Sequence, residues 1–369
     1  MNLQRVDQLS KYDSETLKLY CPVRDEISLV KIFLDYHRHI GIKLFVFLDN
    51  GSVDGTLEYL LAQPDCIVYK TNDSYSKSNF AADWITELMS RHSLSQWAIY
   101  LDCDELLVYE GCEQITLSEF LESYRGTQYD SFAGIMLDVY SAKPNGEVEL
   151  STYEDFLKES FYVDSDYVMR RRPQKPWAKK RRLIEIIGGP RCRLHSSVDK
   201  DSNRSWFAYF IAGQVDRFIR FVPLSFMPLL SRLWPRPLFT QYKMPINYIK
   251  NGFRYTSSHD CINVNTAPYQ LGILHLKFRK DLMQKIEPRF SYENHFQHGL
   301  ERFRLRGALQ RRKSRSFMYA NSIQYVGSQT LAEHLIIGKK PGEVWVKTSD
   351  YFRTSSLSNR SNCSRGGSI

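Results

Sequence analysis

The sequence lacks the cysteine patterns that mark disulfide-stabilised or zinc-binding proteins. Its seven cysteines are odd in number, lie scattered along the chain and include no Cys-x-x-Cys pair. Small secreted folds use an even set of cysteines, and structural zinc sites use closely spaced ones. This pattern argues against a disulfide framework or a zinc site and predicts a reducing compartment.

Long apolar runs, internal repeats and nucleic-acid-binding signatures are absent as well. No stretch of about 18 uncharged apolar residues occurs, so we expect no transmembrane helix. The first seven residues contain no apolar segment of the signal-peptide type, which predicts no secretory signal and a cytoplasmic protein. No RRM, KH or zinc-finger pattern supports a nucleic-acid partner.

The chain is long, aromatic and basic. Its 369 residues, 14% of them aromatic, are enough for one elaborated domain or two small ones with a large core. The net charge of +9 fits an acidic partner such as a nucleotide diphosphate, an anionic lipid or a nucleic acid. The sign of the charge does not choose among these partners.

Apolar runs and helical repeats alternate after a polar lead-in of residues 1–16. Buried strands are expected at residues 17–21, 44–48, 67–69 and 97–101. Helices are expected at residues 27–40, 57–61 and 80–92. Strands and helices that alternate at this spacing predict an α/β fold with a mostly parallel sheet flanked by helices.

Three acidic side chains follow the last of these strands. Asp102, Asp104 and Glu105 separate it from a second apolar run that ends at Tyr109. Carboxylates at the C-terminal end of a buried strand lie where open α/β sheets bind ligands. Asp102 and Asp104, one residue apart, can both face a hard cation such as Mn²⁺ or Mg²⁺. Such a cation would neutralise a diphosphate, which suggests a nucleotide-sugar site.

A solvated turn is the alternative, because an Asp-x-Asp pair arises by chance roughly once in a chain of this length. This chain holds three such pairs, at 102/104, 164/166 and 199/201. The first pair differs from the others because it lies between two apolar runs. It is therefore the one placed like a metal site.

A turn rich in Gly, Asp and Ser, Asp49–Thr56, follows the strand expected at 44–48. Such a turn suits a close approach to a ligand. It is equally explained as a plain strand-to-helix turn in which Asp54 or Thr56 caps the next helix.

Four motifs in order resemble glycosyltransferase family 2, and more closely its branch with a YHxxxGI…DNGSxDGT…DxDE order, which is related to family 92. They are Val23–Glu26, Phe33–Gly41, Phe47–Thr56 and Leu101–Leu106. The resemblance spans about residues 18–140 and implies a GT-A fold, in which a Rossmann-like sheet binds the nucleotide and the Asp-x-Asp motif holds a divalent metal on the diphosphate. Asn50 departs from the pattern, since many members have a second Asp there.

The same resemblance implies contacts with the nucleotide sugar. Arg24 and Glu26 would lie beside the nucleoside, Asp49 would contact the base or ribose, and Asn79 would lie near the sugar nucleotide, as would Asp102. The alternatives are a surface ion pair for Arg24 and Glu26 and a helix N-cap for Asn79.

An inverting transferase needs a carboxylate base that removes a proton from the acceptor hydroxyl. Asp138, at the end of an expected strand over residues 134–141, and Asp164 are our candidates. A similar segment lies beside the acceptor in the related family. Either residue could instead be a loop carboxylate hydrogen-bonded to the backbone.

Two later segments also resemble the branch. Ile187–Arg193 matches its GGPRxR segment, whose glycines could bring Arg191 close to a ligand or form a mere tight turn. Residues 243–278 match its KxP…SxH…HxKF order, which implies a late histidine as a further metal ligand. We expect His275, with His259 as the other choice, although a lone histidine is more often structural.

Two further stretches suggest contact with anions or membranes. Arg170–Arg182 holds eight basic residues in thirteen and could be a lid over the diphosphate, a contact for an anionic acceptor or lipid headgroups, or a solvated loop. Trp206–Phe239 mixes aromatics with arginines, which suits a peripheral membrane helix or a hydrophobic insertion packed on the domain.

The expected divisions follow from these segments. A GT-A domain at 17–280 would contain a nucleotide-binding part (17–140) and an acceptor part (141–280). A C-terminal helical extension at 281–352 and a disordered tail at 353–369 would follow it.

Residues and resemblance together predict a metal-dependent glycosyltransferase of the hexosyltransferase type. It would move a sugar from a nucleotide-sugar donor, expected to be a UDP-sugar, to an acceptor hydroxyl with inversion, in surface polysaccharide or lipid-linked glycan assembly. Mn²⁺ or Mg²⁺ would polarise the leaving diphosphate. The alternatives are another nucleotide-dependent transferase, or a non-catalytic basic protein that binds membranes or nucleic acid.

Overall fold

The computed structural model describes the N-terminal half of the chain almost completely and the C-terminal half in pieces. The described residues are 1–9, 11–144, 147–171, 184–195, 241–280, 309 and 315–339. Most of the basic run at Arg170–Arg182, all of Trp206–Phe239 and the tail from residue 353 lie outside them, so the predictions made for these segments stay predictions.

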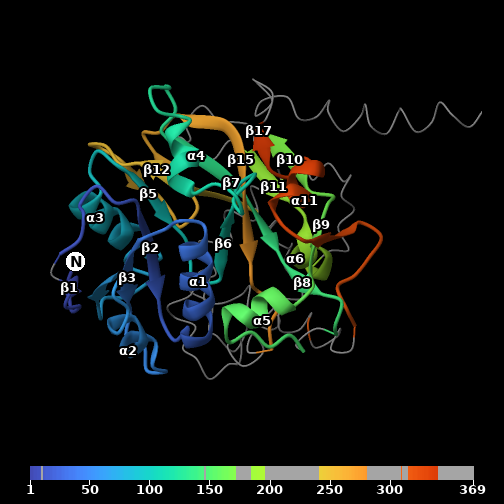
Figure 1. Cartoon of the computed structure of the whole chain (residues 1–369), viewed down its shortest axis with the longest axis horizontal. Coiled ribbons are helices and arrows are strands. Elements are labelled where there is room, and N and C mark those ends of the chain that lie inside the picture. Colours follow the sequence, from blue (N-terminus) through green and yellow to red (C-terminus); the bar gives the residue numbers. More distant parts are fainter. Residues whose placement is uncertain are drawn as a thin grey trace, which may run out of the picture.

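A ten-stranded sheet forms the centre of the molecule, in the order β1-β4-β3-β2-β5-β12-β7-β15-β17, with β6 paired to β15 (Figure 1). Its strands are β1 (Gln4–Arg5), β2 (Lys18–Val23), β3 (Leu44–Asp49), β4 (Cys66–Lys70), β5 (Trp97–Tyr100), β6 (Glu105–Val108), β7 (Ser131–Asp138), β12 (Tyr242–Tyr248), β15 (Thr266–His275) and β17 (Gly338–Lys339). The strands β4, β3, β2, β5, β7 and β15 run in one direction, while β1, β6, β12 and β17 oppose them. The predicted α/β class with a mainly parallel sheet is confirmed.

Helices cover both faces of the parallel strands. Helix α1 (Ile27–His39) packs on the face that carries Phe45 and Phe47, and α3 (Ala82–His92) packs on the face that carries Val46 and Leu48. Because successive side chains of β3 alternate between two covered faces, the strand reads as an unbroken apolar run in the sequence. Helix α2 (Thr56–Leu61) completes the alternation expected for this half.

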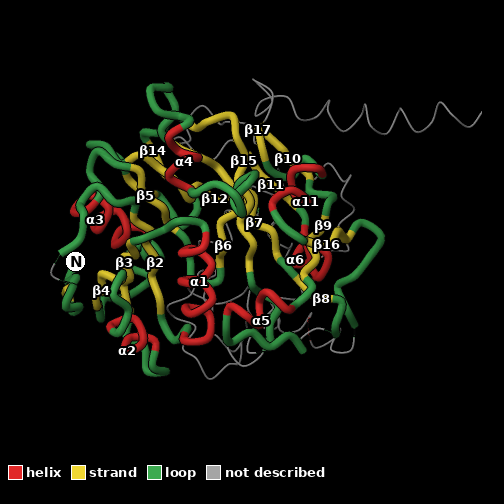
Figure 2. Tube along the Cα trace, in the orientation of Figure 1, coloured by secondary structure: helices red, strands yellow, loops and turns green. Residues whose placement is uncertain are grey.

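Smaller elements surround the central sheet (Figure 2). The remaining helices are α4 (Leu117–Glu122), α5 (Tyr153–Lys158), α6 (Gly189–His195) and α11 (Ser328–Glu333). The remaining strands are β8 (Tyr140–Ser141), β9 (Phe161–Asp164), β10 (Val168–Arg171), β11 (Ile184–Ile187), β13 (Arg254–Tyr255), β14 (Cys261–Ile262) and β16 (Ser322–Tyr325). Within the range expected to be helical after residue 280, the described residues thus form two strands as well as α11. None of the described helices is long and apolar enough to cross a membrane.

The strand directions bring distant residues to one edge of the sheet. Val23 at the end of β2 lies beside Asp49 at the end of β3, and Asp138 at the end of β7 lies beside His275 at the end of β15. His275 also pairs with Glu105 at the start of the antiparallel β6. Carboxylates and an imidazole therefore gather where parallel strands end, the edge at which open α/β sheets bind ligands.

Candidate active site

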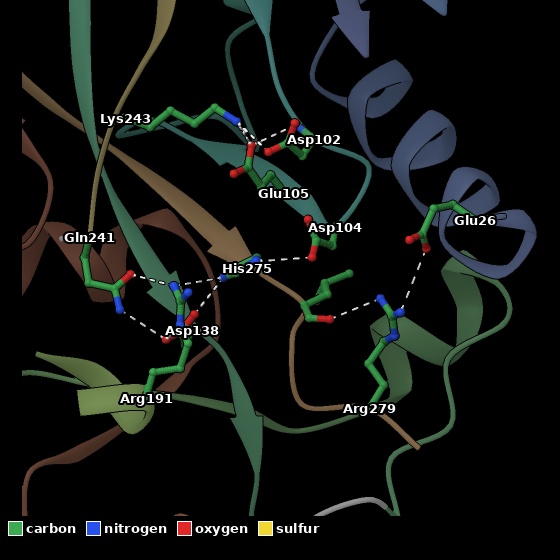
Figure 3. Close-up of polar contacts among 11 residues, drawn as sticks. Glu26, Asp102, Asp104, Glu105, Asp138, Arg191, Gln241, Lys243, His275 and Arg279 are labelled. Carbon is green, nitrogen blue, oxygen red and sulfur yellow. Dashed lines mark hydrogen bonds and ion pairs between the residues drawn. The ribbon is translucent and has the colours of Figure 1, made fainter. Parts of the chain in front are cut away.

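The acidic turn between β5 and β6 is held by its own backbone and by Glu105. The Glu105 amide donates to the carbonyl of Asp102 (3.0 Å), and the Asp102 amide donates to Glu105 Oε2 (2.8 Å). Figure 3 shows the result: the side chain of Asp102 points toward Lys243, and that of Asp104 points toward His275. The two aspartates, predicted to face one cation, thus have different partners.

Lys243 of β12 is a buried lysine that sequence reasoning noted only as part of a motif. Its ammonium lies 3.2 Å from Asp102 Oδ2, contacts Glu105 Oε2 and sits 4.7 Å from the centre of the Tyr100 ring. Burial alone lowers the pKa of Lys243. The carboxylates of Asp102 and Glu105 raise it by more, so the net pKa lies above its usual value and the side chain remains charged. Burial raises the pKa of Glu105, and the attraction of Lys243 offsets this in part.

Asp104, His275 and Asp138 form a chain of contacts. His275 Nε2 lies 3.2 Å from Asp104 Oδ2, and His275 Nδ1 lies 2.7 Å from Asp138 Oδ1. Burial raises the pKa of Asp104, yet His275, Lys277 and Arg279 hold it well below its usual range. Burial lowers the pKa of His275, but Asp104 and Asp138 keep it raised. The imidazole thus links two ionised carboxylates.

The carboxylate of Asp138 is already fully engaged. Arg191 Nε donates to its Oδ2 (2.7 Å), as does Gln241 Nε2 (3.2 Å), and Asp138 has no exposed surface. Burial raises the pKa of Asp138, and Arg191 and His275 lower it far more. Arg191 Nη2 also donates to Gln241 (2.9 Å) and lies 3.4 Å from His275 Nδ1. Arg191, predicted to bind the ligand, lies against Asp138.

The turn after β3 contains a carboxylate oxygen that accepts no hydrogen bond from any described residue. Asp49 Oδ1 accepts from the amides of Gly51 (3.0 Å) and Ser52 (3.1 Å), while its Oδ2 is buried and unpaired. Asn50, the departure from the motif, donates from Nδ2 to the carbonyls of Thr71 and Asp73, both at 3.1 Å. Asn50 therefore fixes the turn to the end of β4.

Glu26 reaches the same edge from the start of α1. Its Oε2 lies 4.0 Å from Arg279 Nη2, and the same arginine donates from Nη1 to the carbonyl of Leu276 (3.2 Å), just beyond β15 (Figure 3). Arg24, by contrast, has a side chain that is 57% exposed and lies 3.9 Å from Asp25. The structure brings Glu26 to the site and leaves Arg24 largely in solvent.

Three other predicted residues have partners elsewhere. Asn79 donates to the carbonyl of Thr256 (2.8 Å), and it is Ala81 rather than Asn79 that occupies the N-cap position of α3. His259 Nδ1 lies 3.0 Å from the carbonyl of Tyr242. The buried Asp164 accepts from Arg193 Nη2 (2.8 Å) and Nε (2.9 Å) and from Tyr140 (2.7 Å). None of the partners named here is Asp104 or His275.

The donor set of this edge fits a divalent cation at Asp104 and His275. Among the described residues no three His, Cys, Asp or Glu side chains form a complete metal-binding cluster. With a proton on Nδ1 facing Asp138, however, His275 turns the lone pair of Nε2 toward Asp104 Oδ2. Two adjacent ligands of an octahedral Mg²⁺ or Mn²⁺ lie about 3 Å apart, given bonds of about 2.1 Å, and the observed separation is 3.2 Å. Substrate phosphates and water would supply the other positions.

Fold and site together define an α/β protein with an acidic, metal-compatible centre at the carboxyl edge of its sheet. No protein-family model matches the chain, and no curated protein matches it. Solved structures resemble part of it at low similarity.

One of these is a mannosyltransferase from Pyrobaculum calidifontis in complex with GDP-Man and Mn²⁺, with 17% identity and a TM-score of 0.25, covering 33% of this chain and 35% of that one. Another is a putative glucose-1-phosphate thymidylyltransferase from Bacillus anthracis in complex with a sucrose (7% identity, TM-score 0.25, covering 36% and 60%). A third is a 4-diphosphocytidyl-2C-methyl-D-erythritol synthase (14% identity, TM-score 0.26, covering 37% and 68%). This chain spans about a third of the mannosyltransferase, and the scores are too low to carry a conclusion about activity.

Proposed function

We propose that the chain is a metal-dependent glycosyltransferase that uses a nucleotide-sugar donor. The supporting observation is the Asp104–His275–Asp138 chain, in which Asp104 Oδ2 and His275 Nε2 lie 3.2 Å apart at the carboxyl edge of the sheet. A proton or a cation must lie between such groups, and the second shell around His275 is the one that metal-bound histidines use. The unpaired oxygen of Asp49 at the same edge supplies an acceptor for a nucleoside.

Each residue then has a defined task. Asp104 and His275 would hold Mn²⁺ or Mg²⁺, which when bound stabilises charge on the leaving diphosphate as a Lewis acid. Asp138 keeps the proton of His275 on Nδ1 and fixes the orientation of the ring. Asp49 Oδ2 would accept a hydrogen bond from a nucleoside that reaches this buried atom, and Glu26 lies at the same edge of the sheet.

The catalytic base requires a revision. Asp138 and Asp164, the two sequence candidates, each accept several strong hydrogen bonds from an arginine and a neighbour. Arg191 and His275 hold the pKa of Asp138 well below its usual value, which leaves it little basicity for an acceptor hydroxyl. Burial raises the pKa of Asp164, but both of its oxygens are occupied by Arg193 and Tyr140. We assign Asp138 a positioning role and Asp164 the role of anchoring α6 through Arg193.

The finer features rest on the motif resemblance alone. These are a UDP-sugar as the donor, inversion at the anomeric carbon, and an acceptor hydroxyl in surface polysaccharide or lipid-linked glycan assembly. A cytoplasmic location with peripheral membrane contact belongs to the same proposal.

The test measures nucleotide release by the full chain from a panel of nucleotide sugars, with and without Mn²⁺. The expected result is metal-dependent release of a nucleoside diphosphate, which Asp104→Asn abolishes while the fold survives. Asp83→Asn, in the first turn of α3, is the matched control and should retain turnover. Unchanged turnover in Asp104→Asn contradicts the metal assignment. Conversion of the nucleotide sugar and added pyrophosphate into a nucleoside triphosphate and a sugar 1-phosphate, with no nucleoside diphosphate released, identifies a nucleotidyltransferase.

A further inference from the structure

Lys243 occupies a position that a second metal ion would otherwise suit. Asp102 Oδ2 and Glu105 Oε2, from the two ends of the acidic turn, converge on its single ammonium nitrogen. Convergent carboxylate oxygens are the ligands that hard cations prefer. Here the cation is part of the chain, and Lys243 and Glu105 are both buried.

Strand pairing explains how the lysine reaches this place. β12 runs antiparallel to β5, with Ile246 opposite Ile99 and Tyr248 opposite Trp97. Beyond these pairs the register of β12 against β7 shifts between Lys243 and Ile246, and the Lys243 ammonium lies 3.2 Å from Asp102 Oδ2, just past the end of β5. The insertion of β12 between β5 and β7 therefore brings one positive charge to the acidic turn.

The lysine also separates the two aspartates. It holds one oxygen of Asp102, whose side chain is 34% exposed, and the amide of Asp102 is tied to Glu105. Asp104 is left to pair with His275 on the other side of the turn (Figure 3). Without a charge at Lys243, three carboxylates within four residues would repel one another and would attract a cation to either side.

We propose that Lys243 is a positioning residue that acts as a built-in cation: it fixes Asp102 and Glu105 and confines divalent-metal binding to the Asp104–His275 pair. The inference rests on the proposed function only for the ion at that pair. It specifies a single resident metal and leaves Asp102 for the nucleotide sugar. Its own prediction, a change in metal count when the charge of Lys243 is removed, holds whether or not the chain is a glycosyltransferase.

The test counts Mn²⁺ bound per chain by electron paramagnetic resonance of free Mn²⁺, with UDP present, for the wild type and Lys243→Met. The substitution removes the charge and keeps most of the side-chain volume. Lys18→Met is the matched control, because Lys18 is also fully buried but bonds Thr16 and Gln96 at the amino end of β2. We expect one additional Mn²⁺ in Lys243→Met and no change in Lys18→Met.

The outcomes are distinguishable. Equal counts in Lys243→Met and the wild type overturn the role of Lys243. The number of Mn²⁺ ions bound by the wild type tests the metal site of the proposed function, and a wild type that binds no Mn²⁺ contradicts that site. The difference in bound Mn²⁺ between the wild type and Lys243→Met tests the role of the lysine.

A double variant covers the case in which Lys243→Met does not fold. A buried carboxylate left without its partner destabilises a fold strongly. If Lys243 acts through its charge, Lys243→Met combined with Glu105→Gln restores folding, seen as recovered far-ultraviolet circular dichroism and a higher Tm. A double variant as unstable as the single one assigns the lysine a packing role and overturns the proposal.

Discussion

The two carboxylate oxygens of Asp49 face different surroundings. Oδ1 is used by the turn itself, through the amides of Gly51 and Ser52, and Oδ2 is buried without a described partner. A buried polar atom without a partner costs free energy. Such an atom is completed by a water, an ion or a ligand, and the position at the end of β3 is where a ligand of this sheet would lie.

Replacing Asp49 with Asn separates stability from binding. The amide oxygen can still accept from Gly51 and Ser52, while a donor replaces the unpaired Oδ2. The Tm should therefore not fall, whereas the Kd for UDP should rise about 10- to 100-fold, the range for one hydrogen bond to a charged group. Calorimetric titration and thermal unfolding measure the two effects, with Asp83→Asn as the control. An unchanged Kd would remove Asp49 from the binding site.

His275 illustrates a residue whose role is set by its neighbours. Alone, a histidine at the end of a strand is ambiguous. With Asp138 at 2.7 Å from Nδ1 and Asp104 at 3.2 Å from Nε2, the two ring nitrogens acquire distinct tasks. The two carboxylates raise the pKa of His275 and so favour the protonated ring. With a metal at Asp104, Nδ1 would keep its proton toward Asp138 and Nε2 would turn its lone pair to the metal. Asp138 in turn keeps its ionised state because Arg191 and Gln241 donate to it.

At the scale of elements, helix α6 depends on a close approach to Tyr167. A Cβ atom on Gly188 would lie 2.6 Å from Tyr167 Cδ1 and 3.1 Å from its Cα, distances at which the backbone must shift. The next residue, Gly189, has φ of +78° and faces the Tyr167 hydroxyl. The glycines thus allow α6 to begin where Arg191 can reach Asp138.

Gly188→Ala should therefore act at a distance. The methyl group pushes the start of α6 away from Tyr167, at a cost of about 1–3 kcal/mol in the free energy of unfolding. The displacement draws Arg191 from Asp138 and weakens Mn²⁺ binding. Urea unfolding and Mn²⁺ titration measure both effects.

Gly126→Ala is the control, because Gly126 has φ of +75° and open space around the added atom. It reports the cost of a left-handed backbone, about 1–2 kcal/mol, and Gly188 also has a positive φ, of +155°. If both variants lose the same stability and neither loses metal affinity, the contact with Tyr167 does not position α6.

For the whole molecule, local pattern was enough for the strands and helices between residues 17 and 101, whereas β1, in the expected lead-in, and α4 were not predicted. β3 has both faces covered by helices, so every residue in it is buried and the apolar run is unmistakable. β12 escaped notice because Lys243, Pro245 and Asn247 interrupt its apolar residues. The partners that let the lysine and the asparagine be buried, Asp102 and Ser131, are more than a hundred residues away in the chain.

The candidate site, like the fold, was predicted in part from local sequence patterns and in part only from tertiary contacts. The sequence indicated Asp102 and Asp104 from their place between apolar runs, and the motif resemblance indicated His275. Which aspartate meets the histidine and which meets the lysine depends on β6 and β12 pairing with strands far along the chain. The spacing of residues within the motif does not show which partner each aspartate has. Only the tertiary structure shows that Asp102 contacts Lys243 and Asp104 contacts His275.

The stability of the whole molecule should depend on pH through His37, which links α1 to β6. Its Nδ1 lies 2.7 Å from the carbonyl of Phe33, and its Nε2 accepts from the amide of Leu107 (3.4 Å). The ring has no exposed surface, and burial lowers its pKa from 6.5 to about 3. The folded state therefore holds His37 neutral at a pH where the unfolded chain binds a proton.

The sign follows from that difference in bound protons. The contribution of His37 is fully present above pH 6.5 and is lost as the pH falls toward 3, with a slope of about 1.4 kcal/mol per pH unit in between. His37→Gln removes the titration and keeps a polar side chain. Urea unfolding of both proteins at intervals from pH 7 to 4 should show the free energy of the wild type falling more steeply than that of the variant. Parallel curves would mean that unfolding takes up no additional proton at His37, and would contradict the lowered pKa of this histidine.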